Sequence, residues 1–369
     1  MPDFDLGFLG GGQLARMSIQ AAQRMGLKCL SLDPGTETPA SQIAPALIGQ
    51  LDNPDNIAEM ARRCDRLTLE NEFIPADAIV KGLQMAGKSE STILPGTACL
   101  RTIQDKLLQR QALRKAEVPS PLAVPIDPQS LNEAIESIGF PMVLKARFGG
   151  YDGKGTRYAR THEEFQSHKP LWQNGGWMAE QFVDFRRELA VIVFIEGSKS
   201  GAFPTMETIQ THHVCDLVFP SDAKGQDIAI RAVQAVGGEG LFGVELFESK
   251  TGEILVNEIA PRPHNTGHYT LDWGGISQFE QHIRIAAALP RGDPQGGECC
   301  MANLLGVDGP FDYHKGLEAA LQHKGVFVHW YGKTEMRAGR KMGHLNAVGP
   351  DCKARAIEVR AAFYAAAKS

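Results

Sequence analysis

A lysine followed at once by a glycine-rich loop is the pattern in this chain that points most directly to phosphate chemistry. Residues 142–144 are apolar and follow a proline, so they predict a short buried strand with Lys145 at its end. The loop behind it, 147–155, holds four glycines and two further cations. Glycine lets backbone N–H groups approach phosphate oxygens that a side chain would block. The pattern predicts a nucleotide-phosphate site; the alternative is a glycine-rich hairpin with solvated charges.

Two glutamates further along predict a cation beside that site. Residues 241–248 and 253–259 read as strands joined by S-K-T-G, a connection with an even number of residues. Cross-strand partners then have an odd sum, which puts Glu245 and Glu258 on one face, opposite or one diagonal apart. Facing carboxylates destabilise a sheet unless a cation bridges them, and Mg²⁺ shared with phosphates suits oxygen ligands. Otherwise one Glu faces solvent, which requires an odd loop or a bulge.

The composition of the chain narrows the class of protein to which it can belong. With 369 residues, 43% hydrophobic and 22% charged, the chain has material for two or three domains. A net charge of -5 argues against a nucleic-acid binder. Apolar runs are short and the amino terminus is acidic, so we expect a cytoplasmic protein without a membrane segment. Seven cysteines without a C-x-x-C pair fit neither a disulfide framework nor a zinc site, and reduced thiols are expected.

The elements suggest an α/β part followed by a mixed part. Strands near 6–9, 27–33, 67–69 and 92–94 predict a Rossmann-like parallel domain over 1–98. A helix over about 102–115 and a proline-rich linker over 118–128 come next. Antiparallel strands are then expected, apart from the hairpin, at 142–147, 156–159, 177–182 and 188–195. Glycine and proline at 289–297 predict a boundary, giving domains 99–290, with a lid at about 118–185, and 295–369.

The amino-terminal turn leaves a dehydrogenase open. Gly10, Gly12 and Ala15 fit G-x-G-x-x-[GA], and Asp33 ends the next strand about twenty residues on.

Other charged residues suit a nucleotide or its relatives. Glu180 is placed to accept from an adenine amino group and Glu188 to hold ribose hydroxyls, although either alone reads as a surface carboxylate. Lys333, Arg340 and their neighbours 337 and 341 put four cations within nine residues. Such a run is either a solvated basic face or the site of a ribonucleotide 5′-phosphate.

Taken in order, these residues resemble the ATP-grasp ligases, with Lys106 as a second phosphate lysine. Longer runs are similar to the N5-carboxyaminoimidazole ribonucleotide synthetase family over essentially the whole chain. They are G-G-G-Q-L from Gly10, K-x-R-x-G-G-Y-D-G-K-G from Lys145, N-E-I-A-P-R-P-H-N-T-G-H-Y-T from Asn257, S-Q-F-E-Q-H-I-R from Ser277 and Y-G-K-x-x-x-R-x-G-R-K-M-G-H from Tyr331. The glycine loop marks only the superfamily, whereas P-R-P-H-N-T-G-H and G-R-K-M-G-H are characteristic of this family.

The resemblance implies a fold and a reaction. The fold would be ATP-grasp, with a Rossmann-like amino-terminal domain, a central domain with a mobile lid and a small carboxy-terminal domain. ATP, Mg²⁺, bicarbonate and 5-aminoimidazole ribonucleotide would give N5-carboxyaminoimidazole ribonucleotide, ADP and phosphate in purine biosynthesis. Carboxyphosphate would be the intermediate, and both direct attack on it and prior release of CO₂ stay open. A homodimer is a family expectation.

The resemblance also implies roles for residues. Catalysis would rest on Lys145, Arg262, His264 and Asn265, and Mg²⁺ on Glu245 and Glu258. ATP would contact Lys106, Lys145, Gly150, Tyr151, Asp152, Gly153, Lys154, Gly155, Thr156, Glu180, Gln181, Phe182, Val183, Glu188, Gln210, Asn257 and Glu258. The ribonucleotide and bicarbonate would contact Tyr151, Asp152, Arg262, His264, Asn265, Thr266, Lys333 and Arg340.

Some positions depart from the family pattern. Gln210 stands where histidine is usual, with His212 or His213 as possible substitutes, and Thr266 and Thr156 replace serine and glutamine. The segment 69–74, L-E-N-E-F-I, is a variant whose meaning the sequence does not supply. Two further alternatives are a formate-dependent glycinamide ribonucleotide transformylase and a non-catalytic ATP-binding scaffold.

Overall fold

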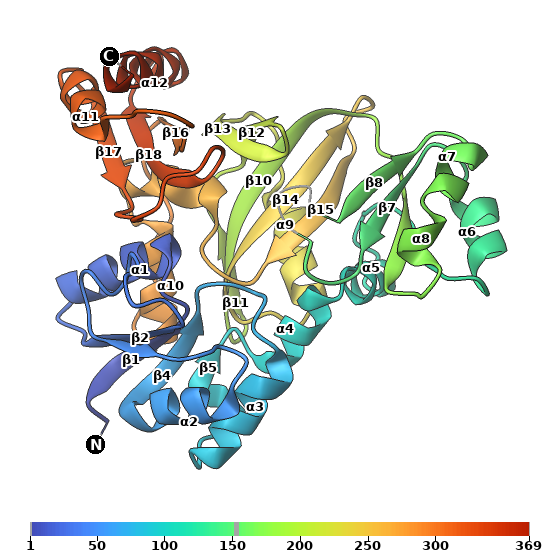
Figure 1. Cartoon of the computed structure of the whole chain (residues 1–369), viewed down its shortest axis with the longest axis horizontal. Coiled ribbons are helices and arrows are strands. Elements are labelled where there is room, and N and C mark those ends of the chain that lie inside the picture. Colours follow the sequence, from blue (N-terminus) through green and yellow to red (C-terminus); the bar gives the residue numbers. More distant parts are fainter. Residues whose placement is uncertain (1, 151–154, 369) are drawn as a thin grey trace.

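The computed structural model describes residues 2–150 and 155–368, and over these it contains three sheets (Figure 1). The amino-terminal sheet is parallel, in the order β3-β2-β1-β4-β5. Its strands are β1 (Phe4–Leu9), β2 (Cys29–Asp33), β3 (Ala46–Ile48), β4 (Cys64–Leu69) and β5 (Ile93–Leu94). The predicted parallel sheet is thus confirmed. It contains in addition β3, a three-residue edge strand that is not among the predicted strands.

Helices pack on this sheet, and each of them buries one of its own faces against it. They are α1 (Gln13–Arg24), α2 (Pro54–Arg63) and α3 (Ala76–Met85), with the short η1 (Glu90–Thr92) before β5. In α2 the Asn53 side chain accepts from the Asp55 N–H and Pro54 occupies the first turn, both ordinary start signals of a helix. Ile57 and Met60 of α2 then reach the core beneath β1 and β4.

The predicted helix over 102–115 is in fact two helices, α4 (Thr97–Gln104) and α5 (Lys106–Lys115). The break falls at Asp105, whose backbone is extended and whose carboxylate accepts from the Leu107 N–H at 3.0 Å. The same carboxylate pairs with the Arg147 guanidinium, which draws it out of any continuous helix. Lys106 consequently starts a helix instead of lying inside one.

A small antiparallel sheet, β6-β9-β7-β8, follows. Its strands are β6 (Ala123–Ile126), β7 (Met142–Ala146), β8 (Thr156–Ala159) and β9 (Trp177–Gln181), flanked by α6 (Leu131–Ile138), α7 (His162–Ser167) and α8 (Lys169–Trp172). The region predicted as a linker therefore contains a strand, and Pro125 is tolerated there because β6 is an edge strand. The rings of Phe165 and Trp172 stack with their centroids 5.2 Å apart. They belong to a hydrophobic core formed by this sheet and its helices.

The third sheet has nine antiparallel strands and joins the central part of the chain to its last part. Its order is β15-β14-β10-β12-β13-β16-β18-β17, with β11 on β10. The strands are β10 (Phe185–Glu196), β11 (Lys199–Ala202), β12 (Met206–Thr211), β13 (Val214–Pro220), β14 (Gly240–Ser249), β15 (Ile254–Ala260), β16 (Cys299–Leu305), β17 (Val326–Trp330) and β18 (Lys341–Val348). Residues 289–298 contain neither helix nor strand, yet β16 pairs with β13 beyond them.

Helices of this region lie against the sheet and the amino-terminal domain. They are α9 (Gln226–Ala235), η2 (Asn265–Leu271), α10 (Gln278–Ala286), α11 (Tyr313–Leu321) and α12 (Cys352–Ala367). Phe279 and Ile283 of α10 pack into the core of α1 and β1, which fixes the amino-terminal domain against α10. Helices α1 and α10 accordingly lie side by side (Figure 1).

All seven cysteines are buried free thiols, as the spacing predicted. Among the described residues, no helix is long and apolar enough to cross a membrane.

Candidate active site

The two predicted metal carboxylates face each other across the β14–β15 hairpin. Glu245 and Glu258 are register partners, as predicted, but by a different route. Near the turn Glu248 pairs with Ile254, which leaves an odd number of residues, 249–253, in the connection. The pairing parity predicted from an even loop was therefore wrong. A bulge at Asn257 of β15, opposite the step from Glu245 to Leu246, then shifts the register by one residue and restores the predicted partners.

The two carboxylates differ in charge environment. Burial raises the pKa of Glu245 to about 7, and the nearby Glu258 and Glu188 carboxylates add to the rise. Burial also acts on Glu258, but the Lys106 Nζ lies 2.6 Å from its Oε1, and the net effect lowers the pKa of Glu258. The negative charge of Glu258 is thus neutralised by Lys106, whereas the ionised form of Glu245 is destabilised because it has no such partner among the described residues.

These donors fit a magnesium ion that shares its coordination with a ligand. Among the described residues no group of three or more His, Cys, Asp or Glu side chains gathers as a metal site. Two facing carboxylates are an incomplete set for Mg²⁺, which is commonly held by one or two carboxylates plus substrate phosphates. The raised pKa of Glu245 is the electrostatic cost that a divalent cation would relieve.

Lys145 belongs to a second, buried charge group. The Glu180 carboxylate forms ion pairs with the Lys145 Nζ at 2.5 Å and the Arg110 Nε at 2.7 Å, and its side chain is 3% exposed. Burial favours the neutral acid, but the two cations lower the pKa of Glu180, whereas burial lowers the pKa of Lys145. Glu180 is placed as the partner of Lys145; its predicted contact with adenine stays a prediction.

Arg110 is a site residue that the sequence analysis missed. Its Nη2 also donates to the Asn257 carbonyl at 2.6 Å, so it links Glu180 to the bulge of the hairpin. A signal was available, because Lys106 and Arg110 are four residues apart on α5 and lie on one face.

The remaining predicted ATP contacts are spread along the boundary of the two antiparallel sheets. Gln181 ends β9, and Phe182, which is 41% exposed, and Val183 lie in the connection to β10. Glu188 lies on β10 between Thr208 and Phe247, and burial raises its pKa to about 7. Gly150, Gly155 and Thr156 border the glycine loop, of which Tyr151, Asp152, Gly153 and Lys154 lie outside the described residues.

The structure separates Gln210 from the two histidines considered in its place. Gln210 is on β12 opposite Cys215, at a register shift. His212 and His213 form the exposed turn to β13 with φ of 51° and 63°. The two histidine side chains therefore project from the tip of the β12–β13 hairpin, whereas Gln210 projects from strand β12 itself.

Arg262 joins the hairpin to the amino-terminal domain. Its guanidinium forms a two-point ion pair with Glu72, with Nη2 2.8 Å from Oε1. Glu72 lies in the loop after β4, and Gln104 holds that loop by donating to the Glu72 and Ile74 carbonyls. The unexplained segment 69–74 thus supplies the carboxylate that orients Arg262. Glu72 is a second residue that sequence reasoning missed, because its partner is 190 positions away.

Glu70 of the same segment lies at the glycine turn. Its Oε1 is 3.4 Å from the Leu14 N–H, and a Cβ on Gly12 would fall 2.3 Å from it. Burial raises the pKa of Glu70 to about 7, although Arg262 opposes the rise. Asp33, the acidic residue of the dehydrogenase fingerprint, instead accepts from the N–H groups of Gly11 and Gly35 at 2.8 Å each.

His264 stands between Glu245 and Thr266. Its Nδ1 is 2.9 Å from the Thr266 hydroxyl and its Nε2 is 3.7 Å from Glu245 Oε1. Burial, with Arg262 nearby, lowers the pKa of His264 well below its usual value, so the imidazole is neutral. Asn265 is committed elsewhere: its amide and that of Asn303 exchange hydrogen bonds of 3.1 and 2.6 Å.

The predicted carboxy-terminal cations Lys333 and Arg340 lie in the loop between β17 and β18, where their side chains bond to backbone carbonyls. Lys333 donates to the Lys341 carbonyl at 2.6 Å, and burial, together with Arg340, lowers the pKa of Lys333 to about 8. Arg340 donates to the Glu335 carbonyl at 2.6 Å. The adjoining loop packs on the amino-terminal domain, since Gln42 donates to the Gly332 carbonyl at 2.5 Å.

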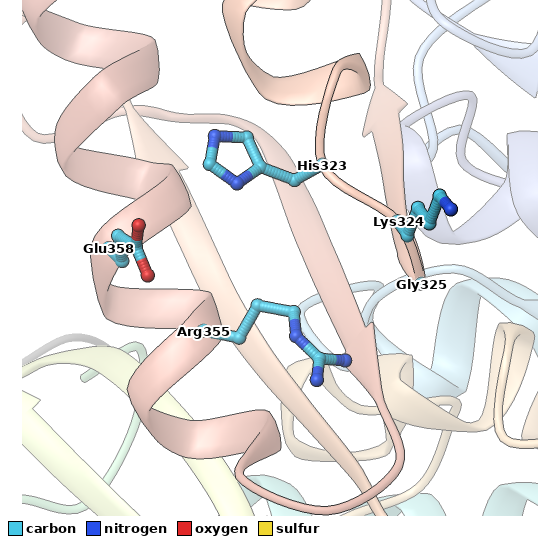
Figure 2. Close-up of a pocket in the computed structure, with 5 residues that line it drawn as sticks. All are labelled: His323, Lys324, Gly325, Arg355 and Glu358. Atoms are coloured by element: carbon cyan, nitrogen blue, oxygen red, sulfur yellow. The ribbon is translucent and has the colours of Figure 1, made fainter.

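A cavity of about 490 Å³ lies elsewhere, between α12 and the start of β17. Figure 2 shows its lining residues, His323, Lys324, Gly325, Arg355 and Glu358. None of them is a predicted site residue. Arg355 is already bonded to the Val348 carbonyl at 2.6 Å.

Comparison with known proteins agrees with this architecture. Residues 4–104 match the family described as ribonucleotide synthetase preATP-grasp domain, and residues 111–279 match the ATP-grasp domain. These matches and the facing carboxylates define an ATP-grasp protein. Residues 299–358 match the phosphoribosylaminoimidazole carboxylase C-terminal domain.

Relatives over the whole length make the assignment particular. The N5-carboxyaminoimidazole ribonucleotide synthase of Synechococcus elongatus is 38% identical over 359 residues, covering 92% of this chain and 88% of the relative. The chain belongs to the N5-carboxyaminoimidazole ribonucleotide synthase family, and the resemblance found in the sequence is confirmed. The phosphoribosylaminoimidazole carboxylase of Schizosaccharomyces pombe is also 38% identical, but the chain spans only 64% of its length.

Solved structures agree. The N5-carboxyaminoimidazole ribonucleotide synthetase of Thermotoga maritima is 34% identical, with a TM-score of 0.84 over 97% of this chain and 98% of that one. The Aspergillus clavatus synthase, solved with ADP and 5-aminoimidazole ribonucleotide, is 29% identical, with a TM-score of 0.87 over 97% and 99%. Because the chain belongs to an ATP-grasp family, the dehydrogenase alternative is not supported.

Proposed function

We propose that this chain uses ATP and bicarbonate to carboxylate 5-aminoimidazole ribonucleotide, giving N5-carboxyaminoimidazole ribonucleotide, ADP and phosphate in purine biosynthesis. The observation that carries the proposal is the facing pair of Glu245 and Glu258, with Lys106 2.6 Å from Glu258. The family supports it, as does the Aspergillus clavatus relative, whose structure holds ADP and the ribonucleotide.

The first step is phosphoryl transfer to bicarbonate. A bicarbonate oxygen forms a bond to the γ-phosphorus while the bond to the departing ADP oxygen breaks, which yields carboxyphosphate. Lys106 and Lys145 neutralise phosphate charge, and Lys145 is presented by Glu180. Mg²⁺, held by Glu245 and Glu258 together with phosphate oxygens, would add charge stabilisation and alignment.

Arg262 is the residue suited to bicarbonate and to the developing carboxyphosphate. A guanidinium binds planar oxyanions through two parallel N–H groups, and Glu72 already fixes the plane of this one. Glu72 also balances the buried positive charge, so that Arg262 can be held in place before the anion binds.

The second step transfers the carboxyl group. The bond between carbon and the phosphate oxygen breaks, the substrate amine forms a bond to that carbon, and the amine loses a proton. We assign the contacts with the amine and ribose to neutral His264 and the Thr266 hydroxyl, which bond to each other, and to Asn265, whose amide bonds to Asn303. Lys333 and Arg340 would receive the 5′-phosphate.

Further parts of the proposal rest on the family and on the sequence. We place the protein in the cytoplasm as a homodimer, with domains over 1–98, 99–290 and 295–369 and residues 118–185 as the lid. The match of residues 299–358 to a carboxylase domain does not favour the glycinamide ribonucleotide transformylase.

The test is ADP release by the purified chain with Mg-ATP and bicarbonate, with and without 5-aminoimidazole ribonucleotide. Strong stimulation by the ribonucleotide is expected. If only glycinamide ribonucleotide with formate stimulated release, the transformylase would replace this proposal. A chain silent with every substrate would favour the scaffold.

A further inference from the structure

Gln278, the first residue of α10, contacts the candidate catalytic histidine without being a predicted site residue. Its side chain is completely buried. Its Oε1 accepts from the His264 N–H at 2.9 Å, and its Nε2 donates to the His264 carbonyl at 2.8 Å. One amide therefore pairs with both polar backbone groups of a single residue, as a neighbouring strand would.

A third hydrogen bond fixes the amide. The Gln278 Nε2 is 3.0 Å from His268 Nδ1, so its second hydrogen is used there and His268 Nδ1 is the acceptor. The orientation of the amide follows from its partners, because a backbone N–H only donates and a carbonyl only accepts. A buried amide with its oxygen and both hydrogens engaged has a single favourable orientation.

The surroundings are close-packed at this point. A Cβ on Gly267 would lie 2.5 Å from Gln278 Oε1, and a Cβ on Gly243 would lie 2.3 Å from His264 Cβ. The Gln278 N–H donates to Thr270 Oγ1 at 2.9 Å, which ties the start of α10 to η2. Two glycines thus make the room that the Gln278 amide and the His264 side chain occupy.

We propose that Gln278 is a positioning residue for the carboxylation reaction and acts on it through His264. The His264 ring has a hydrogen bond to Thr266, and its Nε2 is 3.7 Å from Glu245, beyond hydrogen-bond distance. The direction of the ring is therefore set largely by its backbone, which Gln278 holds at both ends. The inference rests on the proposed contact of His264 with the substrate amine, which is the reacting group of the carboxylation step.

Replacement of Gln278 by methionine tests the proposal, because it removes the three side-chain hydrogen bonds while keeping an unbranched side chain of similar length. The kcat of ribonucleotide-dependent ADP release is expected to fall about 10- to 100-fold, as misplacement of a reacting group by about 1 Å does. The KM for ATP is expected to stay within about twofold of wild type, since the nucleotide contacts are elsewhere.

The matched control is Gln281→Met on the same helix. Gln281 is equally buried, and its Oε1 accepts from the Gly292 N–H at 2.9 Å, away from His264. The Gln281 side chain makes one hydrogen bond where Gln278 makes three, and its buried Nε2 has no partner among the described residues. Gln281→Met is therefore expected to lower the melting temperature less than Gln278→Met, with kcat within about twofold of wild type. Equal kcat losses in the two variants would overturn the proposal, as would a Gln278→Met enzyme with wild-type kcat.

A double variant separates positioning from general damage. In a His264→Gln background, adding Gln278→Met is expected to change kcat by less than about threefold, because the two residues act as one unit. A multiplicative loss would contradict action through His264. Should Gln278→Met fail to fold, Gln278→Glu keeps the acceptor for the His264 N–H and is expected to be intermediate in kcat; wild-type kcat would refute the proposal. Failure of the proposed function is recognised separately, since wild type would then not respond to the ribonucleotide.

Discussion

Two lysine–carboxylate groups lie near one another in this molecule, and they are built differently. Glu180, 3% exposed, is bonded by both Lys145 and Arg110, so its charge is fully compensated. Glu258, 43% exposed, has Lys106 but also faces Glu245, whose pKa is raised to about 7. Among the described residues, the Glu180 group holds one cation in excess, whereas the hairpin pair has two carboxylates for one lysine. The same residue types thus leave positive charge beside Lys145, which suits a phosphate, and negative charge at the hairpin pair, which suits a cation.

The largest expected effect comes from Glu258→Ala. Removal of a metal carboxylate should abolish Mg²⁺-dependent ATP cleavage, with a loss of at least about 1000-fold. ADP release measures it, and Glu253→Ala, an exposed glutamate before β15, is the control expected to keep wild-type rates. Substantial cleavage by the Glu258 variant would mean that the hairpin pair is not the metal site.

Glu180→Gln should act on stability first. It leaves Lys145 and Arg110 buried without a countercharge, and breaking a buried ion pair costs about 3–5 kcal/mol. Urea denaturation in the absence of nucleotide measures the change in the free energy of unfolding. Glu258→Ala should lose much less stability in the same assay; equal losses would erase the distinction between the two groups.

Lys333→Ala tests the other cationic region. We expect the KM for the ribonucleotide to rise about tenfold, as loss of a charge-assisted contact with the 5′-phosphate implies, with a smaller change in kcat. The control is Lys324→Ala in the cavity of Figure 2, which should leave KM unchanged. An unchanged KM in the Lys333 variant would remove Lys333 from the phosphate site.

The smallest effect is a pH dependence carried by Glu188. Burial raises the pKa of Glu188 to about 7 in the folded protein, above its ordinary 4.5. The folded state therefore binds the proton on Glu188 more tightly than the unfolded state does. The resulting contribution to the free energy of unfolding is complete below pH 4.5 and is lost as the pH rises to 7. Glu188→Gln should gain about 1–3 kcal/mol relative to wild type at pH 8 and little at pH 4.5. Urea denaturation at the two pH values decides, and a gain independent of pH would argue against the raised pKa.

Local patterns predicted the strands of the site well. The starts and ends of β7, β8, β9 and β14 were anticipated to within one or two residues, since apolar runs and glycine turns are local signals. The facing of Glu245 and Glu258 was right because an odd loop and a bulge, each of which alone would have broken the predicted pairing, occur together and cancel each other. A bulge depends on tertiary contacts, here the Arg110 bond to the Asn257 carbonyl, which no hairpin rule contains.

What sequence reasoning missed has a long-range cause. Glu72 meets Arg262, and Gln278 holds His264 from a separate helix, so neither spacing nor periodicity reveals them. Asp105 breaks a helix because Arg147, 42 residues on, pairs with it. The predicted linker contains the strand β6, which the prolines of this region argue against. Pro125 fits there because β6 lies at the edge of its sheet.

The nine-stranded sheet has one more consequence. Five strand spacings separate β14 from β18 along it, about 24 Å at the usual ~4.8 Å per strand. Lys341, at the start of β18, nevertheless opposes part of the rise in the pKa of Glu245 on β14. The sheet therefore curves enough to bring the Lys341 charge toward the hairpin pair. The last segment of the chain then helps to set the acidity of the carboxylate pair, so that a change in the carboxy-terminal domain is felt where ATP would be cleaved.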